Sequence, residues 1–223
     1  MKKFNLNNLD QDVYYFTLAN GFKVYLVPFS NKKNFYAVLG TRYGSKDIDF
    51  SCNGDIHSPY GIAHFLEHKM FEKEDGHVLE KFPLIGGSSN AFTSYTHTVY
   101  QVSGTEKFYD NLNLLINFVE HPYFTDKNVE KEKGIIKQEL FMGKDNPYRV
   151  FAFEKLKNLF VNLGYGREIV GEEKDIDSIT KEDLYKCYNT FYNPGNMCLI
   201  IVTNEDEEKV INFVKEIEDK RKV

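Results

Sequence analysis

The chain has 223 residues, of which 28 are lysine or arginine and 33 are aspartate or glutamate, so its formal net charge is −5. Hydrophobic residues make up 42% and charged residues 27%, which is typical of a folded domain and excludes an intrinsically disordered chain. The acidic balance argues against nucleic acid or an anionic membrane as the main partner, and the longest apolar run, residues 197–202, is far shorter than the ~20 residues of a membrane span.

The N-terminal half of the sequence predicts β-strands interrupted by one helix. Strand-forming residues on either side of Asn20-Gly21 predict a hairpin across residues 14–27. The spacing of apolar residues over 58–74 predicts a helix, with Ser58 as its N-cap and Pro59 in its first turn. Two further strands are predicted, at residues 35–43 and as one long strand over 89–103.

The C-terminal half predicts mainly helices. Thr105, Thr125 and Thr180 are the expected N-caps of three of them, the last within a capping box that ends at Asp183. Strands at both ends with helices between them favour an α+β fold, a single two-layer domain with a mostly antiparallel sheet packed against a cluster of helices. The remaining predicted elements are a helix over 150–163 stopped by Gly164, a buried strand over 196–203, and a last helix that begins in the acidic run 205–208.

The strongest chemical signal lies in the early helix, where His64 and His68 flank Phe-Leu-Glu. Two histidines four residues apart project from the same face of a helix, so both imidazoles can reach one metal ion. Glu67 lies close to that face, and a carboxylate there can accept a proton from a water molecule that the metal activates. The alternative is a pair of structural histidines that bind no metal.

A catalytic zinc site needs a third protein ligand and an open position. The predicted helix over 125–144 offers Glu130, Glu132 and Glu139. Glu132 and Glu139 are seven residues apart and therefore lie on one stripe of the helix, which would let one bind the metal while the other supports a histidine. Each of the three is alternatively an ordinary solvated glutamate.

Several segments in the same order resemble the inverzincins, the peptidase family of pitrilysin, insulin-degrading enzyme and the mitochondrial processing peptidase. The match runs from about residue 12 to 220 and is closest to bacterial processing-protease-like members. The segments are Gly61-Ile-Ala-His-Phe-Leu-Glu-His-Lys-Met-Phe71, similar to the motif helix; 86–93, similar to the substrate-binding edge strand; 129–139, similar to the segment with the third ligand; and the Asn193-Pro-Gly-Asn196 turn.

The resemblance implies a role for each matching residue. It makes His64, His68 and Glu139 the ligands of Zn²⁺, Glu67 the general base, and Glu132 the carboxylate that supports the histidines. Asn90 and Ala91 match positions that hold an extended peptide by β-augmentation. From the residues alone, Asn90 is simply a turn residue after a glycine- and serine-rich run.

Family members are built from two or four such units, which enclose the peptide between them. The resemblance therefore implies that residues 1–223 form one zinc-binding half-unit of the pitrilysin-like fold, as the N-terminal half or a fragment of a longer protein. A second homologous domain, or a subunit in a homo- or heterodimer, would close the chamber and supply the arginine and tyrosine pair of the second half. The expected activity of the isolated half is weak or absent.

Two functions of different class follow. The first is a zinc-dependent endopeptidase that hydrolyses peptides or small unfolded polypeptides; the alternative is a non-catalytic peptide-binding subunit of a processing-peptidase-like heterodimer. A structural zinc site would need a fourth protein ligand, and the cysteines at 52, 187 and 198 lack suitable spacing. Their odd number predicts no disulfide framework and favours a cytoplasmic location.

Overall fold

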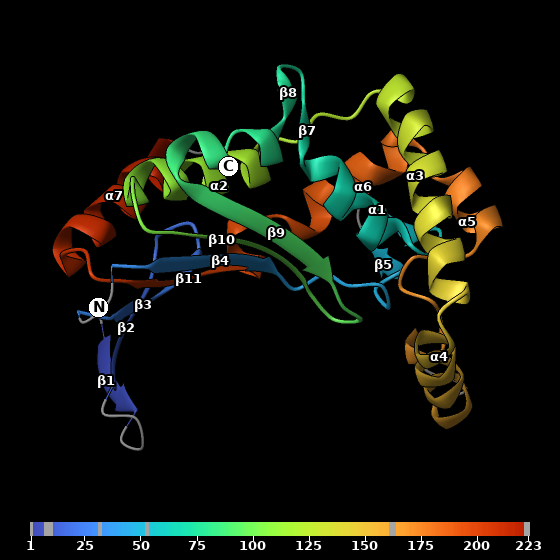
Figure 1. Cartoon of the computed structure of the whole chain (residues 1–223), viewed down its shortest axis with the longest axis horizontal. Helices are drawn as coiled ribbons and strands as arrows, with labels where there is room; N and C mark the ends of the chain where they lie inside the picture. Colours follow the sequence, from blue (N-terminus) through green and yellow to red (C-terminus); the bar gives the residue numbers. More distant parts are fainter. Residues whose placement is uncertain (1, 7–10, 31–32, 52–53, 161–163, 221–223) are drawn as a thin grey trace.

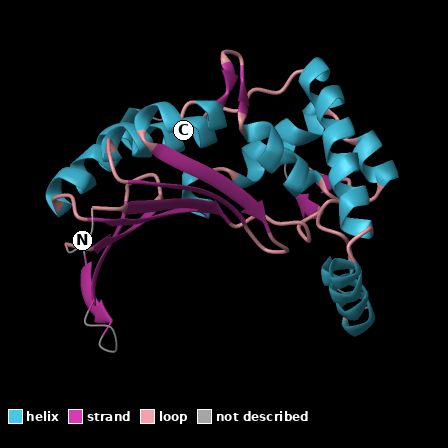
Figure 2. Cartoon of the chain, viewed as in Figure 1, coloured by secondary structure: helices cyan, strands magenta, loops and turns pink. Residues whose placement is uncertain are grey.

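One seven-stranded sheet and a layer of helices make up the computed structural model of the chain, which describes residues 2–6, 11–30, 33–51, 54–160 and 164–220 (Figures 1 and 2). The strand order is β1-β2-β3-β11-β4-β10-β9, and every neighbouring pair is antiparallel except β3–β11. The α+β prediction with a mostly antiparallel sheet is confirmed. The strands are β1 (Lys2–Leu6), β2 (Gln11–Thr17), β3 (Lys23–Pro28), β4 (Phe35–Thr41), β9 (Gly87–Thr93), β10 (Thr98–Gly104) and β11 (Met197–Thr203), and two small hairpins pair β5 (Asp49–Ser51) with β6 (Asp55–His57) and β7 (Glu72–Lys73) with β8 (Gly76–His77).

The helices lie along one face of the sheet and beyond its far end, where α3, α4 and α5 are grouped (Figure 1). Among the described residues, no helix combines the length and the apolar character that crossing a membrane requires. The helices are α1 (Ile62–Met70), α2 (Phe108–Glu120), α3 (Asp126–Lys144), α4 (Pro147–Leu159), α5 (Glu173–Ser178), α6 (Lys181–Phe191) and α7 (Glu207–Lys220), with short 3₁₀ turns at Val78–Glu80, Pro83–Ile85, Gly164–Gly166 and Pro194–Asn196.

Several sequence-based predictions are confirmed. The hairpin around Gly21 is formed by β2 and β3, and the strand predicted over 196–203 is β11, which is buried on one face only because Ile200 is exposed on the other. Thr125 caps α3, and Thr180 forms the predicted capping box with Asp183. Cys187 and Cys198 are free thiols, as expected, while Cys52 lies outside the described residues.

Several predicted helix boundaries are wrong, and at Ser58 a tertiary contact replaces the expected cap. The Ser58 hydroxyl donates to the Ile48 carbonyl at 3.1 Å, and α1 instead begins after Gly61. Lys107 rather than Thr105 precedes α2, and α4 ends at Leu159, so its predicted extension to residue 163 is not formed at residue 160.

The predicted long strand over 89–103 is two strands. The chain turns between β9 and β10, where the Ser94 hydroxyl donates to the His97 carbonyl and accepts the His97 N–H, at 3.0 and 3.1 Å. Strand β1, which the sequence did not indicate, adds a further edge strand next to β2. The turn at Ser94 leaves β9 at the edge of the sheet, with β10 as its only strand neighbour among the described elements.

The two faces of the sheet differ in burial, but both carry apolar side chains on the central strands. Side chains that face the helices, such as Val24, Leu39 and Ile201, are fully buried in the core. The other face is normally polar in an antiparallel sheet. Here it carries a set of partly or wholly exposed apolar side chains that are paired in register across β3, β11 and β4, which we call the open sheet face: Tyr25, Ile200 and Val38 in one row, and Val27, Val202 and Tyr36 in the next.

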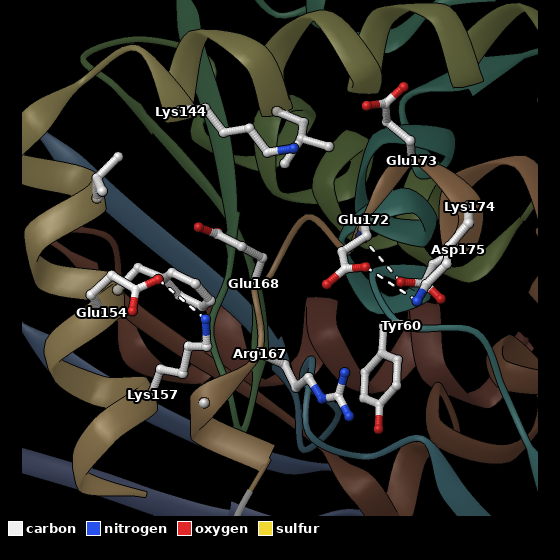
Figure 3. Close-up of a pocket in the computed structure, with 15 residues that line it drawn as sticks. Tyr60, Lys144, Glu154, Lys157, Arg167, Glu168, Glu172, Glu173, Lys174 and Asp175 are labelled. Carbon is white, nitrogen blue, oxygen red and sulfur yellow. Dashed lines mark hydrogen bonds and ion pairs between the residues drawn. The ribbon is translucent and has the colours of Figure 1, made fainter. Parts of the chain in front are cut away.

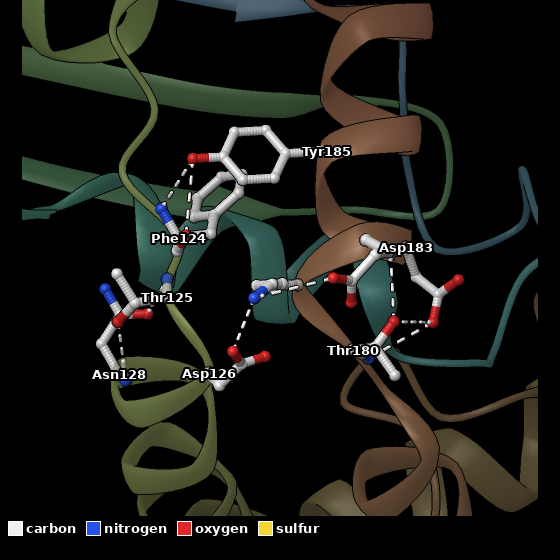
Figure 4. Close-up of polar contacts among 9 residues, drawn as sticks. Phe124, Thr125, Asp126, Asn128, Thr180, Asp183 and Tyr185 are labelled. Carbon is white, nitrogen blue, oxygen red and sulfur yellow. Dashed lines mark hydrogen bonds and ion pairs between the residues drawn. The ribbon is translucent and has the colours of Figure 1, made fainter.

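The N-terminal end of α3 is fixed to α6 (Figure 4). Thr125 and Asn128 exchange side-chain and backbone hydrogen bonds in a capping box. The Tyr185 hydroxyl on α6 accepts the Phe124 N–H at 3.1 Å, and Lys181 pairs with Asp126 at 2.5 Å. These contacts fix the position of α3, which carries Glu132 and Glu139, relative to the core.

Gly61 at the start of α1 is a conformational requirement of the fold. Its φ is +84°, and a Cβ there would lie 2.2 Å from the Val170 carbonyl oxygen. We expect Gly61→Ala to lower the free energy of unfolding by about 2 kcal/mol or more, because it adds both backbone strain and a clash with backbone. Chemical denaturation measures the change.

Gly134 in the exposed part of α3 is the matched control. A Cβ there meets nothing within 4 Å, and its φ lies outside the left-handed range. Gly134→Ala should therefore raise stability by about 0.5–1 kcal/mol, as alanine does in a helix interior. If both substitutions had the same effect, the close approach at Gly61 would not constrain the fold.

Candidate active site

Helix α1 is buried along almost its whole length, including residues that are rarely buried. His64 is 8% exposed and Glu67 is 7% exposed, while His68 is partly exposed. The two histidines are one helical turn apart, and their ring centroids are separated by 4.5 Å. Charged and polar side chains are buried at a cost unless they are paired or hold a metal, so these residues require partners.

Glu139 of α3 supplies the third group. Its Oε2 lies 3.6 Å from His64 Nε2 and 3.5 Å from His68 Nε2, and one ligand atom from each residue lies within 4.8 Å of the others. Ligand atoms of a tetrahedral zinc ion at 2.0–2.1 Å are about 3.4 Å apart. Two imidazole nitrogens and one carboxylate oxygen are a donor set that catalytic zinc uses, so the residues fit Zn²⁺.

Glu132 lies behind this group, two helical turns before Glu139. Its Oε1 lies 3.1 Å from Nδ1 of His68, the ring nitrogen that does not face Glu139. A carboxylate on Nδ1 fixes the imidazole tautomer that leaves Nε2 free to bind a metal. The other carboxylate oxygen, Oε2, lies 3.7 Å from Nζ of Lys69.

Glu67 does not belong to the cluster of His64, His68 and Glu139, which we call the trio, and its hydrogen-bond partner is Thr93. The Thr93 hydroxyl on β9 donates to Glu67 Oε2 at 2.8 Å. Burial raises the pKa of Glu67, and the Thr93 hydrogen bond offsets part of that rise. A carboxylate whose pKa lies nearer neutral pH is better suited to accept and release a proton.

The same environment gives the two histidines very different pKa values. Burial, with a smaller contribution from the neighbouring His68, lowers the pKa of His64 to about 4. Burial also disfavours the charged form of His68, but its hydrogen bonds to Glu132 and Glu139 outweigh this and raise its pKa to about 9. The hydrogen bond to His68 lowers the pKa of Glu139, and that of Glu132 is lowered despite burial.

Asn90 and Ala91 lie on β9, the edge strand that also carries Thr93. Asn90 is exposed, and Ala91 is partly buried against the core. The Ala91 N–H donates to Asn90 Oδ1 at 2.9 Å. A backbone donor at this edge is thus satisfied by a side chain that lies next to it.

The other candidates lie apart from the trio. Glu130 is a solvated residue that pairs with Lys133. Among the described histidine, cysteine and acidic residues, His64, His68 and Glu139 form the one cluster with metal-binding geometry. A cavity of about 720 Å³ lies between α3, α4 and α5, with the Arg167 guanidinium 4.4 Å from the centre of the Tyr60 ring (Figure 3), and none of the three residues lines it.

Two residues beside the site were not predicted from the sequence. Thr93 approaches Glu67 only because β9 packs against α1, and no local pattern signals that contact. Lys69 directly follows His68, yet lysine on a helix normally points to solvent. The signal that could have identified it is its position one helical turn after the apolar residues Phe65 and Leu66, on the side of the helix that faces the core.

Comparison with models of known protein families identifies the family of the chain. The family model described as "Insulinase (Peptidase family M16)" matches residues 55–172, which include the three clustered residues and Glu67. The chain belongs to peptidase family M16. A second model, described as "Peptidase M16 inactive domain", matches residues 178–222.

Relatives of this M16 chain are named zinc proteases. It is 44% identical, over 99% of its length, to the uncharacterised zinc protease YmfH of Bacillus subtilis, and covers 52% of that protein. A crystal structure of an M16-like peptidase from Alicyclobacillus acidocaldarius superposes with a TM-score of 0.91 at 39% identity, covering 95% of this chain and 50% of the other. The chain is 27% identical to a mitochondrial-processing peptidase subunit beta of Arabidopsis thaliana, over 90% of its length and 38% of that protein. The M16 chain therefore spans about half the length of its first relatives.

Zinc stoichiometry tests the ligand assignment. We expect about one zinc per chain in the wild type and loss of zinc from His68→Ala, because two remaining ligands hold zinc poorly. Metal analysis after gel filtration measures both. The exposed His97, which bonds to Ser94 in the β9–β10 turn, provides the control His97→Ala, which should keep full stoichiometry. Unchanged zinc content in His68→Ala would refute the assignment.

Zinc affinity should also depend on pH. His64, with a pKa of about 4, is neutral at pH 6–8, whereas His68, with a pKa of about 9, is protonated and must lose that proton to bind zinc. The apparent association constant should therefore rise about tenfold per pH unit from pH 6 to 8 and level off near pH 9. Competition with a chelator of known proton affinities measures this, and Glu132→Gln should level off at lower pH. An affinity independent of pH would contradict the prediction.

Proposed function

We propose that the chain is the zinc-binding half of an M16 endopeptidase that hydrolyses peptides or small unfolded polypeptides. The observation that carries the proposal is the convergence of His64, His68 and Glu139, with the separate carboxylate of Glu67 beside them. Three ligands leave a fourth tetrahedral position open, which is the arrangement of catalytic rather than structural zinc. The naming of relatives as zinc proteases supports the same function.

When bound, Zn²⁺ would supply Lewis-acid chemistry, polarising a peptide carbonyl and making water more acidic. The chain's own part is proton transfer. Thr93 holds one oxygen of the Glu67 carboxylate, which leaves Oε1 to accept the proton of the attacking water. Glu67 then returns the proton to the leaving amine nitrogen, so that it acts first as base and then as acid.

The edge of β9 is the proposed peptide-binding element. A substrate strand that pairs with this edge would be held mainly by backbone hydrogen bonds, and its side chains would be selected by pockets. Pairing at Ala91 requires Asn90 Oδ1 to release the Ala91 N–H, after which the Asn90 amide can bond to the peptide itself. Since Thr93 lies on the same strand and holds Glu67, the edge would carry the peptide towards the base.

We further propose that the active form contains a second homologous unit, as a domain or as a subunit. The chain spans about half the length of its first relatives, and matched chains include one described as the first half of the periplasmic protease PqqL. The open sheet face, with Ile200 42% and Tyr36 40% exposed, is an apolar surface that a second unit would remove from water. The isolated half is therefore expected to cleave slowly.

Glu67→Gln distinguishes the enzyme from the non-catalytic peptide-binding subunit. The amide keeps the size and much of the hydrogen bonding of the carboxylate but cannot accept a proton, so kcat should fall about 10²–10⁴-fold. Zinc content and peptide affinity should stay near those of the wild type, because the ligands and the β9 edge are unchanged. Cleavage of a quenched fluorescent peptide library by the full-length protein, or by the chain with its partner unit, measures the change.

Glu130→Gln is the matched control, since it makes the same chemical change on an exposed residue and should leave kcat unchanged. Equal rates for Glu67→Gln and the wild type would refute the proposed base. If neither protein cleaves any peptide although both bind zinc and peptide, the binding subunit is the correct function.

A further inference from the structure

Lys69 is a charged residue with no exposed surface, one position after a proposed zinc ligand. Its side chain is 0% exposed, although lysine is almost never fully buried unless it is paired. Its ammonium contacts the Glu72 carboxylate three residues later and lies 3.7 Å from Glu132 Oε2 on the other helix. Moving an ammonium ion out of water is costly, and its two carboxylate partners offset that cost.

Lys69 and His68 each contact a different oxygen of the Glu132 carboxylate. Oε1 faces His68 Nδ1 at 3.1 Å, and Oε2 faces Lys69 Nζ. The Glu132 side chain is itself only 11% exposed, so water offers little competition for either oxygen. A carboxylate held at both oxygens has one orientation, whereas one held at Oε1 alone can rotate away from the imidazole.

We propose that Lys69 is a positioning residue whose buried ammonium holds Glu132 in the orientation that keeps the His68 imidazole ready to bind the metal. This inference rests on the proposed zinc site. Lys69 contacts neither the clustered ligand atoms nor Glu67 among the polar contacts of the structure, so it acts only through Glu132. Glu72 completes the arrangement, because it gives the Lys69 ammonium a second carboxylate partner besides Glu132.

The test is a set of zinc dissociation constants, measured by chelator competition on the full-length protein at one pH. Lys69→Met removes the charge and keeps the length of the side chain. Loss of an outer partner of a metal ligand weakens binding by about 10–100-fold, and we expect at least the lower figure for Lys69→Met. Lys69→Arg, which keeps a charge and can bond to both carboxylates, should restore most of the affinity.

Coupling to Glu132 separates this role from a general structural one. In a Glu132→Gln background, Lys69→Met should change zinc affinity less than about twofold, because the residue through which it acts is already altered. Lys133→Met is the matched control: Lys133 follows Glu132, is 12% exposed and pairs with Glu130 and the Asp177 carbonyl. It should leave zinc affinity unchanged, and the visible spectrum of Co²⁺ bound to Lys69→Met should differ from that of the wild type and of Lys133→Met.

The outcomes are distinct. Wild-type affinity in Lys69→Met, or an equal loss with and without Glu132→Gln, overturns the inference while the zinc site stands. Failure of the wild-type protein to bind zinc overturns the zinc site and the inference together. Normal zinc binding with equal kcat in Glu67→Gln and the wild type overturns only the catalytic proposal. If Lys69→Met does not fold, Lys69→Gln removes the same charge, keeps a polar group, and is judged by the same criteria.

Discussion

The hydrogen bond between His68 and Glu132 is the interaction on which the candidate site depends. It joins α1 and α3 across 64 residues of sequence, and both partners lie largely out of water. With Nδ1 committed to Glu132, the His68 ring can present only Nε2 to Glu139. The approach of His64 to Glu139 then follows from how α1 and α3 are held, whereas Glu67 also depends on β9 through its hydrogen bond from Thr93.

Both helices are held by contacts outside the site. The tight crossing of backbone at Gly61 and Val170 sets the start of α1, and a side chain there would collide with a carbonyl oxygen. The Thr125 capping box and the hydrogen bond from Phe124 to Tyr185 set the start of α3. The first turns of both helices are therefore fixed, and the functional groups lie farther along each rigid helix. Such placement keeps catalytic groups more precisely aligned than a loop would.

The sequence predicted what local periodicity determines. The four-residue spacing of His64 and His68, and the seven-residue spacing of Glu132 and Glu139, placed each pair on one helix face before any contact between helices was known. The choice between Glu132 and Glu139 as ligand was not local, because it depends on the packing of α1 on α3. The prediction that Ser58 caps α1 was wrong for the same reason, because a non-local contact decides it: the Ser58 hydroxyl donates to the Ile48 carbonyl instead. Lys69 was missed because its two partners become visible only when α3 covers it.

The three carboxylates near the histidines, Glu67, Glu132 and Glu139, differ in what surrounds them, and this difference supports the roles proposed for them. Glu139 and Glu132 face His68, which lowers the pKa of both and keeps them anionic. Glu67 is more buried than either, and the hydrogen bond that it accepts comes from the neutral Thr93 hydroxyl, so burial raises its pKa. A metal ligand should hold its charge at every working pH, whereas a general base must gain and lose a proton. When neighbouring carboxylates all belong to glutamates, environments that separate their pKa values in this way distinguish a general base from a metal ligand.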